Sequence, residues 1–160
     1  MSKLDDVHIG LEGLKVYQVA RSFRNSMYSL VDRLPDKEKY ALASQARRAA
    51  ISVTNNIAEG YGRFTWQDTT QFFYIARGSV AELIDDLSIC LDQKYFPVDV
   101  LNALKEQAVV VVQLINGYIR YLQQSKHTQG GRSRRSLPAD QSAENRVPSP
   151  ESQIPNIESQ

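Results

Sequence analysis

Residues 98–122 read VDVLNALKEQAVVVVQLINGYIRYL, and the spacing of their apolar side chains decides the fold. An apolar residue recurs every three or four positions, at Leu101, Leu104, Ala108, Val111, Ile115, Tyr118 and Leu122. This alternation is typical of helices that pack nearly side by side. Pro97 stands just before the stretch, where the first turn of a helix accepts proline because that N–H has no partner within the helix. We therefore expect a long helix after Pro97.

Three segments upstream repeat this spacing and predict three more helices. The first contains Val16, Ala20, Phe23, Met27, Leu30 and Leu34. Pro35 is expected to end it, because proline removes a backbone donor and clashes with the preceding turn. The second contains Ala43, Ala46, Ala50, Val53, Ile57 and Tyr61, and it closes among Gly60 and Gly62. The third contains Phe72 or Phe73, then Ala76, Val80, Leu83, Leu87 and Cys90. Thr65, with Asp68 three residues later, predicts a capping box at its start.

Short connections between these segments predict that consecutive helices are antiparallel neighbours. We expect an all-α fold, an antiparallel up-down-up-down four-helix bundle over residues 13–126, after an N-terminal arm of residues 1–12. Residues 127–160 are rich in Ser, Pro, Gly and Gln. Such a stretch buries too little surface to offset its chain entropy, so we expect a disordered tail. Three arginines in this tail would suit a phosphate backbone, although a solvated linker is the simpler interpretation: Arg132, Arg134 and Arg135.

Composition excludes several classes of protein. The single cysteine, Cys90, rules out an internal disulfide and is expected to be an inert core thiol. The N-terminus lacks the apolar segment of a secretory signal, and no apolar run is long enough to cross a bilayer, so we expect a cytoplasmic protein. The two histidines, His8 and His127, lie outside the predicted helices. We expect no metal, no cofactor and no enzymatic activity, because no carboxylate–histidine pairs and no phosphate loop are present.

The last predicted helix holds more apolar side chains than one buried stripe needs. Besides the stripe it contains Val109, Val110, Val112, Leu114, Ile119 and Tyr121. A helix that is apolar nearly all round is buried on more than one side. The extra side chains indicate that copies of the chain associate. The alternative is a broad core stripe with a few exposed valines, which is common.

Charge is uneven along the chain, although the formal net charge is only +1. Residues 13–77 contain ten Lys/Arg and five Asp/Glu, and residues 78–126 contain four and six. The first helix places Tyr17, Arg21, Arg24 and Tyr28 on one face, and the next segment adds Lys37, Lys39, Arg47 and Arg48. Guanidinium groups on phosphate, with rings available for stacking, suit a nucleic acid. The alternative is a solubilising surface with tyrosines at the edge of the bundle.

Polar side chains also lie beside the core stripe of the second helix, at Ser52, Asn56, Glu59 and Arg63. A polar row in this position usually forms a hydrogen-bond network that fixes helix register. Glu59 and Arg63 are one turn apart and are expected to pair. On the third helix, an acidic cluster is expected to form a solvated face or to pair with nearby arginines: Glu82, Asp85 and Asp86.

Several motifs resemble one known family. Residues 14–17 read LKVY, residues 40–53 read YALASQARRAAISV, residues 55–63 read NNIAEGYGR, and residues 76–79 read ARGS, followed by Glu82-Leu83. Together they are similar to the bacterial intervening-sequence proteins, which are encoded within inserts of 23S ribosomal RNA genes and are often labelled four helix bundle proteins. The resemblance covers roughly residues 10–125 and does not include the tail.

The resemblance implies a four-helix bundle that assembles as a ring-shaped homopentamer. It also implies kinship with the accessory variability determinant (Avd) of diversity-generating retroelements. That accessory protein has a basic, barrel-like pentamer that binds nucleic acid and the reverse transcriptase of the element. No RNA-contact residue is transferred from the family to this chain.

Two functions from different classes follow as hypotheses. The first is a non-catalytic oligomeric scaffold that binds RNA or DNA, as an accessory to a diversity-generating reverse transcriptase or in association with rRNA intervening sequences. Its candidate nucleic-acid-binding residues are Arg21, Arg24, Arg47, Arg48 and Arg63, some of which could instead make subunit contacts. The second is a structural or protein-interaction oligomer with no nucleic-acid role. Only the first predicts binding that weakens steeply with salt.

Overall fold

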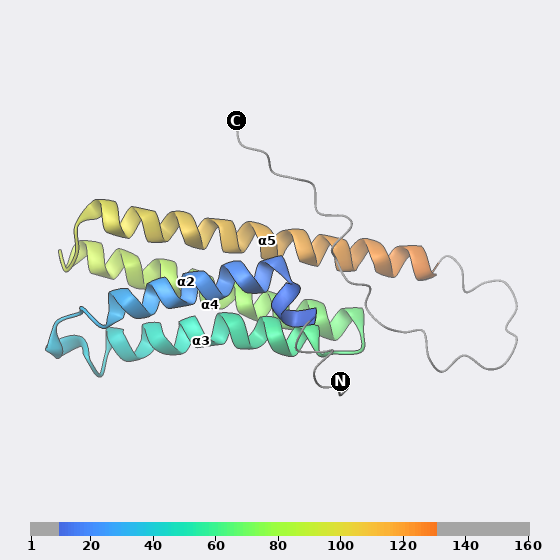
Figure 1. The fold of residues 1–160 in the computed structure, drawn as a ribbon, viewed down its shortest axis with the longest axis horizontal. Helices are drawn as coiled ribbons and strands as arrows, with labels where there is room; N and C mark the ends of the chain where they lie inside the picture. Colours follow the sequence, from blue (N-terminus) through green and yellow to red (C-terminus); the bar gives the residue numbers. More distant parts are fainter. Residues whose placement is uncertain (1–9, 131–160) are drawn as a thin grey trace, which may run out of the picture.

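The computed structural model describes residues 10–130, with side chains described as far as residue 125. Four long helices make up most of this part: α2 (Lys15–Val31), α3 (Leu42–Tyr61), α4 (Trp66–Asp92) and α5 (Val98–Gly130) (Figure 1). A short 3-10 helix, η1 (Asp36–Glu38), lies between α2 and α3, and residues 10–13 form one helical turn before α2. Residues 10–130 contain no strand, so the predicted all-helical class is confirmed.

The four long helices form an elongated bundle (Figure 1). Helix α2 packs against α3 and α5, and α4 packs against the same two helices. All members of the α5 stripe are buried, from Leu101 to Leu122. In the other three stripes, leaving aside the open choice between Phe72 and Phe73, only Leu34 and Tyr61 are partly exposed. Both lie at the end of a helix or just beyond it. The apolar spacing therefore identified the core correctly.

Paired side chains show how neighbouring helices are aligned. Helices α4 and α5 are joined by a ring stack, Phe73–Tyr118, and by two hydrogen bonds, Arg77–Asn116 and Ser88–Lys105. Residue numbers rise along α4 as they fall along α5. The first half of α4 therefore lies beside the second half of α5, and this alignment determines which charges meet between them.

The start of α4 is capped as predicted. Thr65 Oγ1 accepts the Asp68 N–H at 3.1 Å and donates to Asp68 Oδ2 at 2.7 Å. The first bond satisfies a donor that has no partner within the helix, and the acidic side chain lies at the positive end of the helix dipole.

The end of α2 differs from the prediction. The helix ends at Val31 rather than at Pro35. The N–H groups of Arg33 and Leu34 donate to carbonyls three residues earlier, at 3.0 and 3.1 Å. This i to i−3 pattern is the tighter turn with which many helices finish, so the helix has already changed geometry before the proline is reached.

The predicted domain limits also shift at both ends. Residues 10–12, assigned to an N-terminal arm, belong to the helical turn before α2, and α5 continues to Gly130 instead of ending at residue 126. Residues 131–160, most of the predicted disordered tail, lie outside the described residues. Within residues 10–130, none of the helices combines the length and the apolar character needed to cross a membrane.

The extra apolar side chains of α5 fall into three groups. Ile119 is buried within the protomer, and Val112, Leu114 and Tyr121 are partly buried. Only Val109 and Val110 are exposed, by 49 % and 44 %. Most of the surplus is thus explained by the core of the bundle, and two adjacent valines remain on the surface.

Candidate nucleic-acid interface

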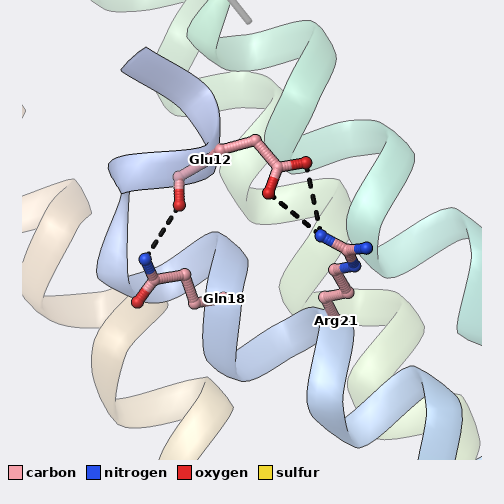
Figure 2. Close-up of polar contacts among 3 residues, drawn as sticks. All are labelled: Glu12, Gln18 and Arg21. Atoms are coloured by element: carbon pink, nitrogen blue, oxygen red, sulfur yellow. Dashed lines mark hydrogen bonds and ion pairs between the residues drawn. The ribbon is translucent and has the colours of Figure 1, made fainter. Parts of the chain in front are cut away.

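Arg21 on α2 is held by the helical turn that precedes the helix. Its Nη1 donates to both carboxylate oxygens of Glu12, at 3.0 and 3.3 Å, while the Glu12 carbonyl accepts a hydrogen bond from Gln18 Nε2 at 2.8 Å (Figure 2). Glu12 therefore contacts α2 through both its backbone and its side chain. The two charged side chains are about half exposed, at 49 % and 46 %. Such a pair contributes at most about 1 kcal/mol, so a phosphate can displace the carboxylate at little cost.

Two more of the predicted arginines have carboxylate partners. Arg47 Nη2 on α3 donates to Asp32 Oδ1 at 2.8 Å, next to the end of α2. Arg63 pairs with Glu59, which confirms the predicted i, i+4 pair, and its guanidinium lies 4.7 Å from the ring centroid of Phe72. Both ion pairs are solvent-exposed. They orient the guanidinium groups at the surface more than they stabilise the fold.

Arg24 and Arg48 form no ion pair with any carboxylate among the described residues. Arg24 Nη1 donates to Thr54 Oγ1 at 3.1 Å, across the contact between α2 and α3. Arg48 is exposed and lines a groove of about 410 Å³ between α3 and α4, which it shares with Glu82. One guanidinium is therefore engaged by a neutral hydroxyl, and the other stands near a carboxylate without pairing to it.

The five predicted arginines do not form one surface. Arg24 and Arg47 contact residues across the α2–α3 boundary, and Arg21 contacts the turn before α2. Arg48 lies on the α4 side of α3, and Arg63 stands just past the end of α3 against an aromatic ring of α4. The five arginines therefore differ in the elements that they contact.

The polar row of α3 forms the predicted network and connects α3 to α4. Ser52 Oγ and Ser79 Oγ are 2.8 Å apart, and Asn56 Nδ2 donates to the Ser52 carbonyl and hydroxyl oxygens at 2.8 and 3.0 Å. All three side chains are at least partly buried, and each has a partner. A buried network of this kind fixes the register of the two helices, because sliding one helix would leave its polar groups unpaired.

The prediction that Asp86 belongs to a solvated or arginine-paired acidic face is wrong. Its side chain is 1 % exposed, and Oδ1 accepts a hydrogen bond from Gln45 Nε2 on α3 at 3.0 Å. Among the described residues, Oδ2 has no hydrogen-bond partner. Burial, and then the nearby charges of Asp85 and Glu82, raise the pKa of Asp86 to about 6. The other two acids of the cluster are exposed, as predicted.

Cys90, one turn further along α4, is also buried. Burial is the main cause that raises the pKa of its thiol to about 11, followed by the charges of Asp86 and Glu38. Because the thiolate is the nucleophilic form, this thiol is unreactive at neutral pH.

A second polar surface, which was not predicted from the sequence, lies between α4 and α5. A groove of about 430 Å³ is lined by Tyr74 and Arg77 from α4, and from α5 by Gln113, Asn116, Ile119, Arg120 and Gln123. A signal for it exists in the sequence, since residues 107–125 contain no Asp or Glu. The count over residues 78–126 hid this signal, because all six acids of that range lie between residues 82 and 106.

Comparison with models of known protein families identifies a family. A family model described as 23S rRNA-intervening sequence protein matches residues 12–117, which is more than half of the 160-residue chain. The matched region runs from the turn before α2 to the middle of α5, and it includes four of the seven residues that line the α4–α5 groove. No curated protein matches the chain.

Proposed function

Because this chain belongs to the family of 23S rRNA-intervening sequence proteins, we propose that it is a non-catalytic scaffold that associates with copies of itself and binds nucleic acid. The name of the family links it to ribosomal RNA, which supports a role with RNA. The proposal includes an antiparallel up-down-up-down bundle that assembles as a homopentamer in the cytoplasm. The alignment of α4 with α5 is consistent with that bundle topology.

Nucleic-acid binding depends on one observation: arginines on α2, on α3 and just after α3 keep their guanidinium groups at the surface, in ion pairs that a phosphate can replace. The side chains of Arg21, Arg47 and Arg63 are between 37 % and 49 % exposed, and those of their carboxylate partners are between 46 % and 65 % exposed. Exposed pairs of this kind contribute little. A polyanion that replaces the carboxylates also releases its own counterions, which favours binding.

Replacing all five arginines, Arg21, Arg24, Arg47, Arg48 and Arg63, with glutamine is expected to weaken RNA binding by about 30-fold at about 0.1 M salt. The matched control replaces the same five with lysine, which keeps the charges and loses only the planar donor geometry. Fluorescence anisotropy with a labelled RNA oligonucleotide, measured over a series of salt concentrations, gives the affinity and the salt slope. Circular dichroism checks that each variant is folded. Equal affinity of the glutamine variant and the wild type would exclude these residues as the binding surface.

Self-association is supported by apolar side chains that the protomer leaves in contact with water. Val109 and Val110 on α5 are exposed, as are Ile75 and Ile89 on α4. Ile75 and Ile89 are fourteen residues apart, two heptads, and therefore lie on nearly the same face of their helix. Gly78 lies between them on that face, where a Cβ atom would meet nothing within 4 Å. Glycine in an exposed helix disfavours the helix by about 1 kcal/mol relative to alanine, and it permits close approach of another chain.

The double change Val109→Glu and Val110→Glu is expected to weaken self-association by at least about tenfold, because a charge buried at a subunit contact without a partner is unfavourable by about 2 kcal/mol or more. The control is Val98→Glu, since Val98 is a similarly exposed valine at the start of the same helix. Sedimentation velocity over micromolar concentrations reports the assembly. A wild-type protein that stays monomeric there would remove self-association from the proposed function.

The exposed apolar side chains also support the alternative, an oligomer that binds only protein. This alternative predicts that partner affinity changes little with salt and that purified protein has no bound nucleic acid. An accessory role with a diversity-generating reverse transcriptase, or one with rRNA intervening sequences, is the finer form of the first proposal. Both contexts require nucleic-acid binding, so the salt titration tests them together.

A further inference from the structure

The α4–α5 groove differs from the predicted arginine surface in its charge balance. Arg77 and Arg120 line it, and no Asp or Glu does. No ion pair of the described residues involves either arginine. Three of the five predicted arginines, by contrast, are paired with carboxylates. The α4–α5 groove is therefore lined by two arginines that form no ion pair with a carboxylate of the described residues.

The surrounding sequence extends this imbalance. Residues 69–81 of α4 and residues 107–125 of α5 contain no acidic residue, and the alignment of the two helices places these stretches side by side. Apart from Asp68, all the acidic residues of α4 and α5 lie at the opposite ends of the two helices. Residues 82–106 contain these six acidic residues and two lysines. The positive charge of the groove therefore has no acidic residue of these two stretches beside it, and the pair of helices has a basic end and an acidic end.

The groove is already organised for a ligand. Arg77 Nη1 donates to Asn116 Oδ1 at 2.9 Å, and its guanidinium lies 5.0 Å from the ring centroid of Tyr74. Gln123 Nε2 donates to Tyr74 Oη at 3.3 Å. These contacts hold Arg77 through one donor and leave its other donors available, and Tyr74 remains 38 % exposed. Arg120 is exposed on the other wall.

We propose that the α4–α5 groove binds a single strand of nucleic acid, with Arg77 and Arg120 on successive phosphates and Tyr74 in contact with a base. Guanidinium groups recognise phosphate oxygens through paired donors, and the amides of Gln113 and Asn116 add polar contacts to sugar or base edges. This site rests on the proposed nucleic-acid function, and it includes none of the five arginines predicted from the sequence.

The shape of the groove favours a single strand over a duplex. Its volume of about 430 Å³ accommodates little more than a nucleotide, and it lies between two adjacent helices. A base must leave a stack to reach a tyrosine ring, which a single strand allows at low cost. A duplex presents only its phosphates to such a groove.

The test compares two double variants of the full chain. In the first, Arg77→Gln and Arg120→Gln remove both charges from the groove. In the control, Lys94→Gln and Lys105→Gln remove two charges from the acidic end of the same helices. The probe is a labelled 20-nucleotide RNA of mixed sequence, used alone and as a blunt duplex, in anisotropy titrations over a salt series. The first variant is expected to bind the single strand about tenfold more weakly, with a salt slope smaller by about 1.4, while the control binds like the wild type.

Arg120→Glu is a second variant that avoids the contacts of Arg77 inside the protomer, and it is expected to weaken binding at least as strongly. If the wild type binds no RNA, the proposed function fails and the groove with it. If the wild type binds RNA and both groove variants bind equally well, only the groove is overturned. Equal losses for single strand and duplex would overturn the single-strand preference. A groove variant whose assembly changes in sedimentation would identify the groove as a subunit contact instead.

Discussion

Replacing Asp86 with asparagine is expected to raise the free energy of unfolding by about 2 kcal/mol at pH 8. The amide has the shape of the carboxylate, and its oxygen can still accept from Gln45 Nε2, but a buried negative charge is removed. A shift of about two pKa units corresponds to about 3 kcal/mol. The gain is smaller than this, because the new amide N–H2 lies where Oδ2 has no partner among the described residues. Urea denaturation followed by circular dichroism measures the change.

Asp85→Asn is the matched control for this prediction. Asp85 is the preceding residue of the same helix and is exposed, so its replacement is expected to change the unfolding free energy by less than about 0.5 kcal/mol. A stabilisation of similar size in both variants would mean that the general charge of the helix is responsible, and not the burial of one carboxylate.

The pH profile of the wild type checks the same cause. The pKa of Asp86 is about 6 in the folded state and 3.8 for an ordinary aspartate. Between these values the folded state binds a proton that the unfolded state does not, so stability from this group rises as the pH falls through 6 and levels off below about 4. The contribution is up to about 3 kcal/mol, and Asp86→Asn is expected to remove it from the profile. A wild-type profile that instead falls steadily from pH 7 to pH 5 would contradict the burial of this charge.

The position of Asp86 along α4 predicts a buried side chain, but its residue type does not. Ser79 and Asp86 are seven residues apart, and both face α3, where they meet Ser52 and Gln45. This second, polar stripe runs beside the apolar one. The residue type predicted an exposed side chain, because an aspartate is rarely buried. The position was decided by a partner on another helix, Gln45, which no local pattern reveals.

The ion pairs of the candidate interface also show that contacts between distant parts of the chain are not predicted by local sequence patterns. The sequence correctly predicted the Glu59–Arg63 pair, because the two residues are only four positions apart, and Arg63 comes just after the last turn of the helix that holds Glu59. It did not predict that Glu12 pairs with Arg21, since that contact requires the chain to turn before α2 (Figure 2). The α4–α5 groove depends on which halves of two helices lie together. Local spacing predicts contacts within a helix, and the alignment of helices decides the rest.

The helical stripes themselves were predictable because helix geometry fixes which positions face inward. One position stayed open: Phe72 is four residues before Ala76 and Phe73 is three, so either fits the stripe. The structure buries Phe73. A Cβ atom added to Gly60 on α3 would come within 3.0 Å of the Phe72 Cβ atom and 3.1 Å of the Phe73 ring, so the absence of a side chain there lets both phenylalanines of α4 approach α3 closely.

Phe73→Ala is therefore expected to lower the free energy of unfolding by about 4 kcal/mol, the largest effect predicted for this chain. The ring is 0 % exposed and stacks on Tyr118 with centroids 4.4 Å apart, so its removal leaves a cavity and also loses a ring contact. Phe72→Ala, the control, is expected to lower it by only about 1–2 kcal/mol, because that ring is partly exposed and its contact with Arg63 is at the surface. If Phe73→Ala does not fold, Phe73→Leu is expected to remain folded and to lose about 1–2 kcal/mol. Equal losses at the two positions, measured by urea denaturation, would contradict the assignment of Phe73 rather than Phe72 to the core.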